Sequence, residues 1–190
     1  KVVIPLYEHE VRQAVKELMK TGVEAIAILF LFSYINPEHE QNAARIARQT
    51  RKQIRREVPV FISSEVSPTI RELARLNSVV IQAYAAEPVR EQLFRIEDRL
   101  KQAGAQNPLQ TMLAYGGLAP VRYPRLYESV VSGPVGGVLG ARYLGEAVGI
   151  NNLITADMGG TSFDVGLVTE GKIPLVREPE FARFIFNLPM

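Results

Sequence analysis

Apolar and polar positions along the chain predict helices and strands in turn. Apolar residues recur at helical spacing over residues 7–20, and Thr21-Gly22 is typical of a helix end. The unbroken apolar run 25–32 then predicts a strand covered on both faces, as in the centre of an α/β sheet. Asn36-Pro37 begins a second helix as N-cap and first helical residue, and residues 58–62 form a short strand. This order of elements predicts an α/β fold.

The second helix has one apolar stripe and one strongly basic surface. The stripe predicted to be buried consists of Ala43, Ile46, Ala47 and Ile54. The basic surface consists of Arg45, Arg48, Arg51, Lys52, Arg55 and Arg56. Nucleic-acid binding is one interpretation, but this helix lacks aromatic residues for stacking on bases, and cations near a helix C-terminus also suit the helix dipole. We therefore interpret it as a solvated or partner-facing surface and expect no nucleic-acid partner.

The middle of the chain, from residue 64, has a different pattern. Ser67-Pro68 predicts the start of a short helix. An apolar helix over 76–86 is expected to break or kink at Glu87-Pro88, because proline removes a backbone donor. A further apolar stripe consists of Val89, Leu93, Ile96 and Leu100. The alternation over 109–114 predicts another strand of the central sheet.

The last third of the chain predicts a helix followed by a hairpin. The helix has the apolar stripe Val138, Ala141, Leu144 and Val148, and Gly149 ends it. Two apolar runs rich in β-branched residues, 153–156 and 165–168, then flank the segment Asp157–Asp164. Their length and composition are typical of buried strands. The segment between them is therefore predicted to be a tight connection between two antiparallel strands.

The segment Asp157–Asp164 combines carboxylates, a glycine pair and a hydroxyl group. Gly159 and Gly160 permit positive φ and leave no side chain in the way, so that successive N–H groups can converge on one anion. Thr161 adds a hydroxyl, while Asp157 and Asp164 would repel a bare phosphate but suit one accompanied by Mg²⁺. These features predict a site for a nucleotide polyphosphate with its metal ion. The alternative is an ordinary hairpin turn, since such turns also favour Asp and Gly.

Other nucleotide motifs fit less well. No Gly-x-x-x-x-Gly-Lys-Ser/Thr occurs, and a strand-like run follows the glycine pair where a Rossmann or P-loop fold needs a helix. No arrangement typical of metal hydrolases or serine hydrolases occurs either. A second anion site is conceivable at the predicted start of the helix before the hairpin, through free N–H groups and the helix dipole. Its residues are Ser132, Gly133, Gly136 and Gly137, although the glycines could equally permit close helix packing.

Composition indicates a globular protein large enough to bury a core. Of the 190 residues 47% are hydrophobic, the formal net charge is +2, and there is no cysteine. The absence of cysteine excludes a disulfide framework and fits a reducing compartment, so we expect a cytoplasmic protein. No apolar run approaches the ~20 residues that span a bilayer, and no signal-like leader opens the chain, so we expect no membrane association. Both ends lack polar tails, which suggests a section of something longer.

Several segments together resemble the hydantoinase A / 5-oxoprolinase family. They are Gly22–Ala27, Phe32–Glu40, Ser64–Val66, Asn77–Tyr84, Gly116-Gly117, Ser132–Gly137 and Asp157–Asp164. The resemblance implies an ATPase fold of the actin/Hsp70 type, in which two ribonuclease-H-like halves face each other and each carries one phosphate hairpin. On this basis residues 1–63 would finish the first half, 64–131 would form a helical connection and a strand, and 132–190 would start the second half.

The resemblance also implies an activity. Family members are ATP-dependent N-methylhydantoinases, 5-oxoprolinases and acetone or acetophenone carboxylases, which phosphorylate a carbonyl or cyclic-amide oxygen before water or CO₂ attacks. Gly159, Gly160 and Thr161 would hold phosphate oxygens. Asp157 would be the catalytic residue, holding Mg²⁺ or orienting the acceptor, and Asp164 would support the loop or a second metal-bound water. The implied cofactors are ATP and Mg²⁺, and the implied partners are a cyclic amide or ketone and a hydantoinase B type subunit or a second copy.

The chain also departs from the family pattern. Members carry another Asp-x-Gly-Gly-Thr hairpin near their N-terminus, which is absent here, so this piece alone is expected to bind and turn over ATP poorly. Tyr115 stands where Asn is expected, and Phe163 stands where a small or polar residue is common. Two other classes of function stay open: a nucleotide-dependent conformational or assembly protein of the same fold, and a scaffold subunit with the basic helix 37–56 at its interface.

Overall fold

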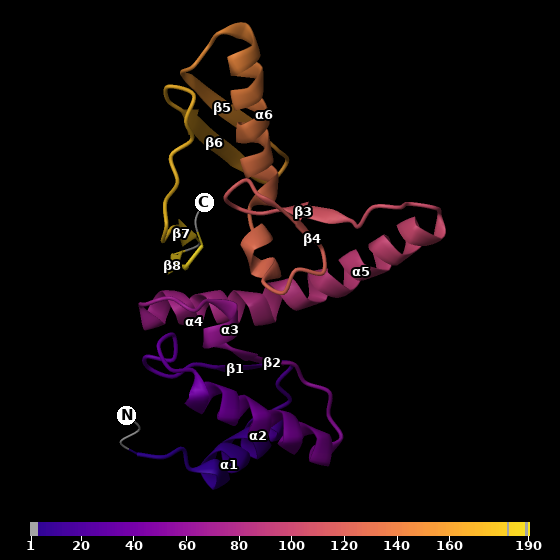
Figure 1. The fold of residues 1–190 in the computed structure, drawn as a ribbon, viewed down its shortest axis with the longest axis vertical. Coiled ribbons are helices and arrows are strands. Elements are labelled where there is room, and N and C mark those ends of the chain that lie inside the picture. The colour runs from indigo at the N-terminus through magenta and orange to yellow at the C-terminus, as the bar shows by residue number, and fades with distance from the viewer. Residues whose placement is uncertain (1–3, 182, 189) are drawn as a thin grey trace. The chain divides into compact units, whose positions relative to one another are not determined.

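The computed structural model describes residues 4–181, 183–188 and 190 and divides the chain into two compact units. The first unit comprises Lys1–Pro88 with Glu180–Asn187, and the second comprises Val89–Pro179 with Leu188–Met190. Both units contain helices and short strands, which confirms a mixed α/β protein (Figure 1). The expected division at residues 63 and 131 stays a prediction.

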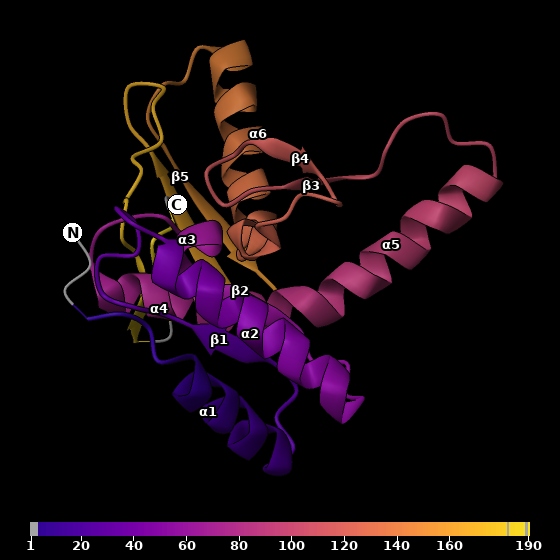
Figure 2. The same ribbon diagram turned by 60° about the horizontal axis from the view of Figure 1, so that its bottom comes forward.

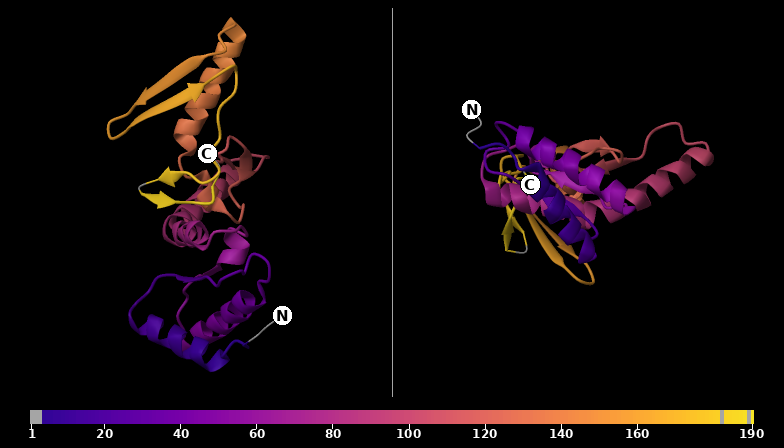
Figure 3. Two further views of the ribbon diagram at one scale, coloured as in Figure 1. Left: turned by 90° about the vertical axis from the view of Figure 1, so that its left-hand side faces the viewer. Right: turned by 90° about the horizontal axis from the view of Figure 1, so that it is seen from below.

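The first unit begins with two helices that pack against a pair of parallel strands. Its elements are α1 (Glu8–Lys20), β1 (Ile26–Ile28), α2 (Glu38–Ile54) and β2 (Val60–Ile62). β1 and β2 pair in parallel, with Ile26 opposite Val60, and α1 and α2 lie side by side against them (Figures 1 and 3). The buried core is formed by Val15, Met19, Ile26, Ala44, Ala47, Val58, Val60 and Ile62. The predicted helix–strand order is therefore confirmed.

The predicted strand over 25–32 is wrong in length and in burial. Only three of its residues pair with β2, Ala27 is exposed, and the side chains of Leu31 and Phe32 are 71% and 62% exposed. The chain turns at Phe32, whose φ is 58°, instead of continuing the ladder. Ile54, expected in the buried stripe of α2, is also exposed, because it lies in the last turn of that helix.

Two buried charged side chains, Glu40 and Arg75, each bind the segment after β1. Glu40, fully buried in α2, accepts hydrogen bonds from Phe30 N–H at 2.9 Å, from Ser64 N–H at 2.8 Å and from the Ser63 hydroxyl. Burial alone would raise the pKa of Glu40, but these hydrogen bonds outweigh it and hold the pKa below its ordinary value. Arg75, also fully buried, donates to the Phe30 carbonyl at 2.7 Å. Both backbone groups of Phe30 are thus bonded to buried charges.

The arginines of α2 contact their own unit. Arg48 donates to the Val60 carbonyl at 3.3 Å, Arg51 donates to the Val58 carbonyl at 2.6 Å, and Arg45 pairs with Glu8 at 3.0 Å. Part of the basic surface seen in the sequence therefore donates to backbone carbonyls in β2 and just before it, since the guanidinium group offers several donors.

The predicted helix start at Ser67-Pro68 is wrong. The structure instead has α3 (Ser63–Val66), α4 (Glu72–Ile81), a π-helical turn η1 (Gln82–Ala86) and α5 (Glu87–Gln102). The helix expected to break or kink at Glu87-Pro88 continues through the proline. The π-helical turn precedes Pro88, and such a turn accommodates the missing N–H and the bulk of the proline ring.

Two short strands near the C-terminus complete the first unit. β7 (Glu180–Phe181) and β8 (Phe184–Ile185) pair antiparallel, and β8 packs against α4. The Asn77 amide donates to the Ile185 carbonyl at 2.9 Å, and the Asn187 N–H donates to the Ser78 hydroxyl at 3.1 Å. None of the described helices is both long and apolar enough to cross a membrane.

The second unit is organised around one long helix. Its elements after α5 are β3 (Gln110–Met112), β4 (Leu118–Pro120), a 3₁₀ turn η2 (Leu126–Ser129), α6 (Ser132–Val148), β5 (Leu153–Met158) and β6 (Phe163–Val168). α6 lies along the hairpin β5–β6 and also contacts β3 (Figures 1 and 2). Gly149 ends α6 in the left-handed conformation, with a φ of 76°, as predicted.

Three expectations for this unit are wrong. The strand over 109–114 is part of a two-stranded hairpin, β3–β4, and not of a central sheet. The apolar stripe of α5 is largely exposed, and the side chain that α5 buries is Glu97, which binds Arg122 Nε at 2.6 Å. In α6, Leu144 and Val148 are exposed as well. Each two-stranded sheet is too small to cover the apolar stripes that the sequence pattern assigned to a buried core.

Candidate functional site

The hairpin β5–β6 has the register that the sequence predicts. Asp157 lies directly opposite Asp164, and Met158 lies opposite Phe163. The N–H of Gly159 donates to the Ser162 carbonyl at 2.9 Å and closes the turn formed by residues 159–162. The predicted antiparallel pairing of the two apolar runs is therefore confirmed, and the glycine pair lies at the tip of the hairpin.

Side chains alternate between the two faces of this hairpin. One face carries the cross-strand pairs Thr155–Gly166 and Asp157–Asp164 and is turned toward α6. The other face is exposed and apolar and consists of Ile154, Ala156, Met158, Phe163, Val165 and Leu167. Directly opposed side chains have Cβ atoms about 4.5–5.5 Å apart, and opposed like charges are destabilising. A cation between Asp157 and Asp164 would remove that repulsion.

Gly166 allows α6 to approach the hairpin closely. A Cβ atom added to Gly166 would lie 2.2 Å from Cγ2 of Val138 on α6 and 2.5 Å from Oγ1 of Thr155. No side chain can occupy that space, so glycine at this position sets the distance between the helix and the two strands. Asp157 and Asp164 are each two residues nearer the hairpin turn than Thr155 and Gly166, and they lie beside the first turns of α6.

A hollow of about 220 Å³ separates the carboxylates from α6. Its walls are Pro134, Gly137, Val138, Ala141, Thr155, Ala156, Asp157, Asp164, Val165 and Gly166. The hollow brings the acidic pair of the hairpin together with Gly137, a residue of the second anion site expected from the sequence. Ser132, Gly133 and Gly136 do not line it. The structure thus unites parts of two motifs that lie about 20 residues apart in the sequence.

The neighbouring glycines of α6 have different roles. A Cβ atom on Gly136 would lie 3.3 Å from the sulfur of Met112, so Gly136 permits close packing of β3. A Cβ atom on Gly137 would meet nothing within 4 Å, because this position faces the hollow. Gly136 therefore permits close packing, which was one of the two alternatives for this segment. Ligand binding, the other alternative, stays a prediction for Gly137.

The two glycines of the hairpin turn differ in their hydrogen bonding. Neither Gly159 nor Gly160 adopts the positive φ that glycine permits. The N–H of Gly159 is occupied by the turn, whereas no backbone hydrogen bond of Gly160 N–H or Thr161 N–H occurs among the described residues. A Cβ atom on Gly160 would meet nothing within 4 Å. Gly160 and Thr161 therefore offer free backbone donors, as Ser162 does, and there is open space beside Gly160.

The acidic pair offers an incomplete set of metal ligands. The Ser162 hydroxyl lies 3.3 Å from an oxygen of Asp164, and Asp157 makes no ion pair with any described residue. No group of three or more acidic, histidine or cysteine side chains gathers within the part of the chain that the structure describes. Two carboxylates leave most of the octahedral positions of Mg²⁺ to water and ligand oxygens, which is how this ion is usually held with nucleotides.

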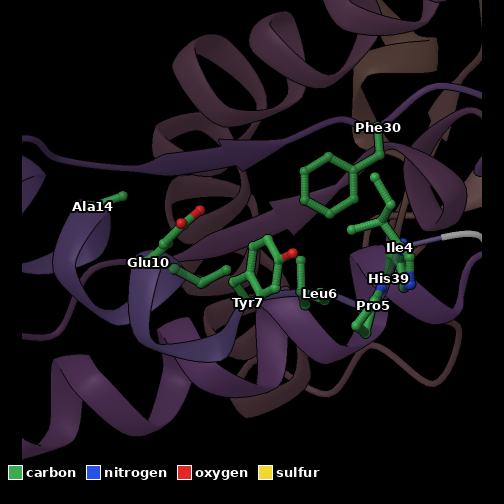
Figure 4. Close-up of a pocket in the computed structure, with 9 residues that line it drawn as sticks. Ile4, Pro5, Leu6, Tyr7, Glu10, Ala14, Phe30 and His39 are labelled. Atoms are coloured by element: carbon green, nitrogen blue, oxygen red, sulfur yellow. The ribbon is translucent and has the colours of Figure 1, made fainter.

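A larger hollow, of about 430 Å³, lies in the first unit (Figure 4). Its walls are Ile4, Pro5, Leu6, Tyr7, Glu10, Val11, Ala14, Phe30 and His39. The lining is mainly apolar, and it has one carboxylate and one imidazole in place of an opposed pair of carboxylates. The smaller hollow is the better candidate site because the opposed carboxylates Asp157 and Asp164 line it. Gly159, Gly160 and Thr161 do not line it and lie at the tip of the same hairpin.

Sequence reasoning missed the buried charged side chains. Glu40, Arg75, Glu97 and Glu128 are each almost fully buried. A signal was present in α2, because Glu40 falls at helical spacing with Ala43, Ala44 and Ala47, and that spacing places it on the buried face. The hydrogen-bonding partners of Glu40 come from distant segments and could not be read from the pattern.

Comparison with protein families identifies the class to which this fold and site belong. Residues 75–190 match the model described as Hydantoinase/oxoprolinase, and residues 1–51 match the Hydantoinase/oxoprolinase N-terminal region. The chain belongs to the hydantoinase/oxoprolinase family, as the resemblance in the sequence predicts.

Particular relatives are between 34% and 38% identical to this chain over the aligned residues. It is 38% identical to the acetone carboxylase beta subunit of Xanthobacter autotrophicus over 99% of its length. It is 34% identical to the caprolactamase subunit alpha of Pseudomonas jessenii over 98%, and 37% identical to the 5-oxoprolinase of Saccharomyces cerevisiae over 96%. The chain spans 26%, 26% and 14% of these relatives.

Two solved structures resemble this chain closely. A nucleotide-free structure of acetone carboxylase superimposes with a TM-score of 0.96 at 38% identity, over 99% of this chain and 26% of that one. The crystal structure of an ATP-dependent caprolactamase from Pseudomonas jessenii superimposes with a TM-score of 0.83 at 33% identity, over 100% of this chain and 27% of that one.

Proposed function

We propose that these residues are a section of a longer ATP-dependent enzyme and that they form one wall of its nucleotide site. The observation that carries the proposal is the opposed pair Asp157 and Asp164, which faces Gly137 of α6 across an open hollow. The relatives support ATP as the ligand, since one is described as an ATP-dependent caprolactamase and another structure concerns ATP-dependent acetone carboxylation. On this proposal the ribonuclease-H-like, actin-type architecture holds for the full-length protein.

The hollow and the hairpin turn at the end of β5 and β6 together fit a divalent metal ion and a phosphate group. Gly160 and Thr161 have N–H groups without a backbone acceptor, and no protein atom fills the space beside Gly160. Free backbone donors suit phosphate oxygens. The opposed carboxylates of Asp157 and Asp164 suit Mg²⁺, a hard cation that prefers oxygen ligands. The two kinds of group are close in sequence and lie at the same end of the hairpin.

Each residue of the site then has a defined task. When bound, the nucleotide supplies an activated phosphoryl group. Gly160 and Thr161 hold phosphate oxygens through their N–H groups, and the Thr161 hydroxyl adds a third donor. Gly159 keeps the turn closed through its bond to Ser162, which leaves no side chain in the path of the phosphates. Positioning and neutralisation of charge account for most of the catalysis of phosphoryl transfer, so a rigid hairpin is well suited to this role.

The carboxylates act on the metal ion and on the acceptor. Asp157 holds Mg²⁺ or orients the oxygen that accepts the phosphoryl group, and Asp164 holds a metal-bound water or supports the turn. The acceptor in this proposal is a carbonyl or cyclic-amide oxygen, whose phosphorylation prepares the molecule for ring hydrolysis or carboxylation. The relatives named as carboxylase and caprolactamase subunits support a second subunit as partner.

The scaffold alternative has less support. It relied on the basic helix as an interface, but Arg45, Arg48 and Arg51 bind groups of their own unit.

Replacement of Asp157 by Asn tests the proposal in the full-length protein. Asn preserves the turn but removes the charge, so we expect kcat to fall by about 10²-fold or more while nucleotide affinity changes much less. Asp98→Asn is the matched control, because Asp98 is an exposed carboxylate of α5 that pairs with Arg122. Steady-state kinetics and calorimetric titration with Mg-ATP give both quantities. A folded Asp157→Asn variant with the kcat of the Asp98→Asn control would make the hairpin a purely structural turn.

A further inference from the structure

Glu128 is a buried carboxylate just before α6. Its side chain is 8% exposed, and one of its oxygens accepts hydrogen bonds from the hydroxyls of Tyr115 and Tyr123, both at 3.1 Å. The other oxygen lies 3.3 Å from Nε of Arg125. The backbone carbonyl of Glu128 also accepts the Ala114 N–H at 2.7 Å. Glu128 therefore ties the turn of the β3–β4 hairpin to the chain that leads into α6.

Both phenols stay protonated and can serve as donors. Burial raises the pKa of Tyr115 above its ordinary value, and the negative charge of Glu128 raises it further. The same two causes raise the pKa of Tyr123. A carboxylate that accepts two hydroxyl hydrogen bonds forms charge-assisted bonds, which are stronger than bonds between neutral groups.

The β3–β4 hairpin that Glu128 holds is packed against the first half of α6. A Cβ atom on Gly116 would lie 2.9 Å from Leu139, and one on Gly136 would lie 3.3 Å from Met112, so the two elements are in close contact at both glycines. Three residues after Glu128, Val131 caps the N-terminus of α6 with a φ of 57°. This conformation is strained for a β-branched residue and persists only where the surroundings impose it.

The turns of α6 that are fixed in this way face the acidic pair. Pro134 and Gly137 line the hollow opposite Asp157 and Asp164. Glu128 makes no contact with the hollow itself, since it is absent from the lining. Its effect on the hollow passes through Tyr115, the β3–β4 hairpin and the position of α6.

We propose that Glu128, with Tyr115 and Tyr123, is a positioning group that fixes the first turns of α6 at the distance from the hairpin β5–β6 that nucleotide binding requires. This inference rests on the proposed function of the hollow. It assigns a role to side chains outside the hollow, because a displaced α6 would move Gly137 away from the phosphates while it leaves Asp157 in its place.

Replacement of both tyrosines by phenylalanine in the full-length protein tests the inference. Two charge-assisted hydrogen bonds are lost without a change in shape, so we expect the KM for Mg-ATP to rise about tenfold and kcat to change by less than about threefold. Tyr143→Phe is the matched control, because Tyr143 lies on α6, is 75% exposed and is not part of the Glu128 cluster. Each single variant should give an intermediate KM.

Glu128→Gln and Glu128→Ala add a rescue test. Gln keeps an oxygen that accepts both phenols, so its KM should lie closer to the original value than that of Ala. If Glu128→Ala fails to fold, the tyrosine variants still decide. If the variant with both Tyr115→Phe and Tyr123→Phe has the same KM for Mg-ATP as Tyr143→Phe, the inference is overturned, and this holds for any kcat of Asp157→Asn. If Asp157→Asn also leaves kcat unchanged, the proposed function falls with it, whereas a low kcat for that variant leaves the proposed function standing.

Discussion

Substitutions at two glycines of α6 can distinguish an effect on ligand binding from an effect on the stability of the helix. Gly137 and Gly140 both lie inside the helix, neither has a positive φ, and a Cβ atom on either would meet nothing within 4 Å. Gly137 lines the hollow and Gly140 does not. Replacement of either by Ala adds a methyl group to open space, so that only a ligand in the hollow could distinguish the two variants.

The expected magnitudes follow from this geometry. Alanine is more favourable than glycine within a helix by about 0.8–1.0 kcal/mol, so both variants should stabilise α6 to the same extent. At Gly137 the new methyl group would also enter the hollow, at a cost of about 1–3 kcal/mol to binding of a nucleotide that fills it, by analogy with an overpacked core. Nucleotide affinity should therefore fall by at least about fivefold in Gly137→Ala and stay unchanged in Gly140→Ala.

Hydrogen exchange and calorimetry on the full-length protein measure these two effects separately. Protection of the α6 amides should rise about fivefold in both variants, which corresponds to about 1 kcal/mol of local stability. Titration with Mg-ATP should then distinguish them. If Gly137→Ala binds the nucleotide as tightly as Gly140→Ala does, while both helices gain protection, the hollow is not where phosphate lies and the reasoning is refuted.

Two further predictions concern stability and packing. The free energy of unfolding of Glu40→Gln at pH 7 should be about 2–3 kcal/mol lower than that of the unchanged protein, because the substitution removes the charge to which the Phe30 and Ser64 N–H groups donate. The pKa of Glu40 in the folded state is lowered from its ordinary value of 4.5, so this contribution to stability is present above about pH 4.5 and is lost as the pH falls through the folded-state pKa. Urea unfolding should therefore show the difference in unfolding free energy between the two proteins becoming smaller as the pH falls below 4.5, and a difference that does not depend on pH would contradict this. Gly166→Ala should destabilise the packing of α6 on the hairpin by about 1–3 kcal/mol, because its methyl group would overlap Val138; thermal unfolding measures this, and an unchanged midpoint would disprove the tight contact.

The hairpin and α6 could be predicted because their signals are local. Two apolar runs of matching length flank Asp157–Asp164, and pairing them in register places the two carboxylates opposite each other. Gly149 likewise marks the end of α6 by a local rule. The different roles of Gly136 and Gly137 were beyond the sequence, because successive helical residues point about 100° apart and only the surrounding elements decide which one meets β3.

The buried charges could not be predicted because they depend on contacts between distant segments. Glu40 is stabilised by Phe30 and by Ser64, which lie 10 and 24 residues away. Those contacts also end β1 early, since Phe30 bonds to buried charges instead of to a neighbouring strand. The apolar stripe of α5 was misjudged for a related reason, because helical spacing identifies an apolar face but does not say whether another element covers it.

The most direct test is a structure of the full-length protein with a non-hydrolysable ATP analogue and Mn²⁺ in place of Mg²⁺. Anomalous scattering locates the metal ion, and the map locates the phosphates. The account predicts the manganese peak beside Asp157 and Asp164 and a phosphate group within hydrogen-bonding distance of the Gly160 and Thr161 N–H groups. A fully occupied nucleotide whose metal ion and phosphates lie away from this hairpin would contradict the central claim.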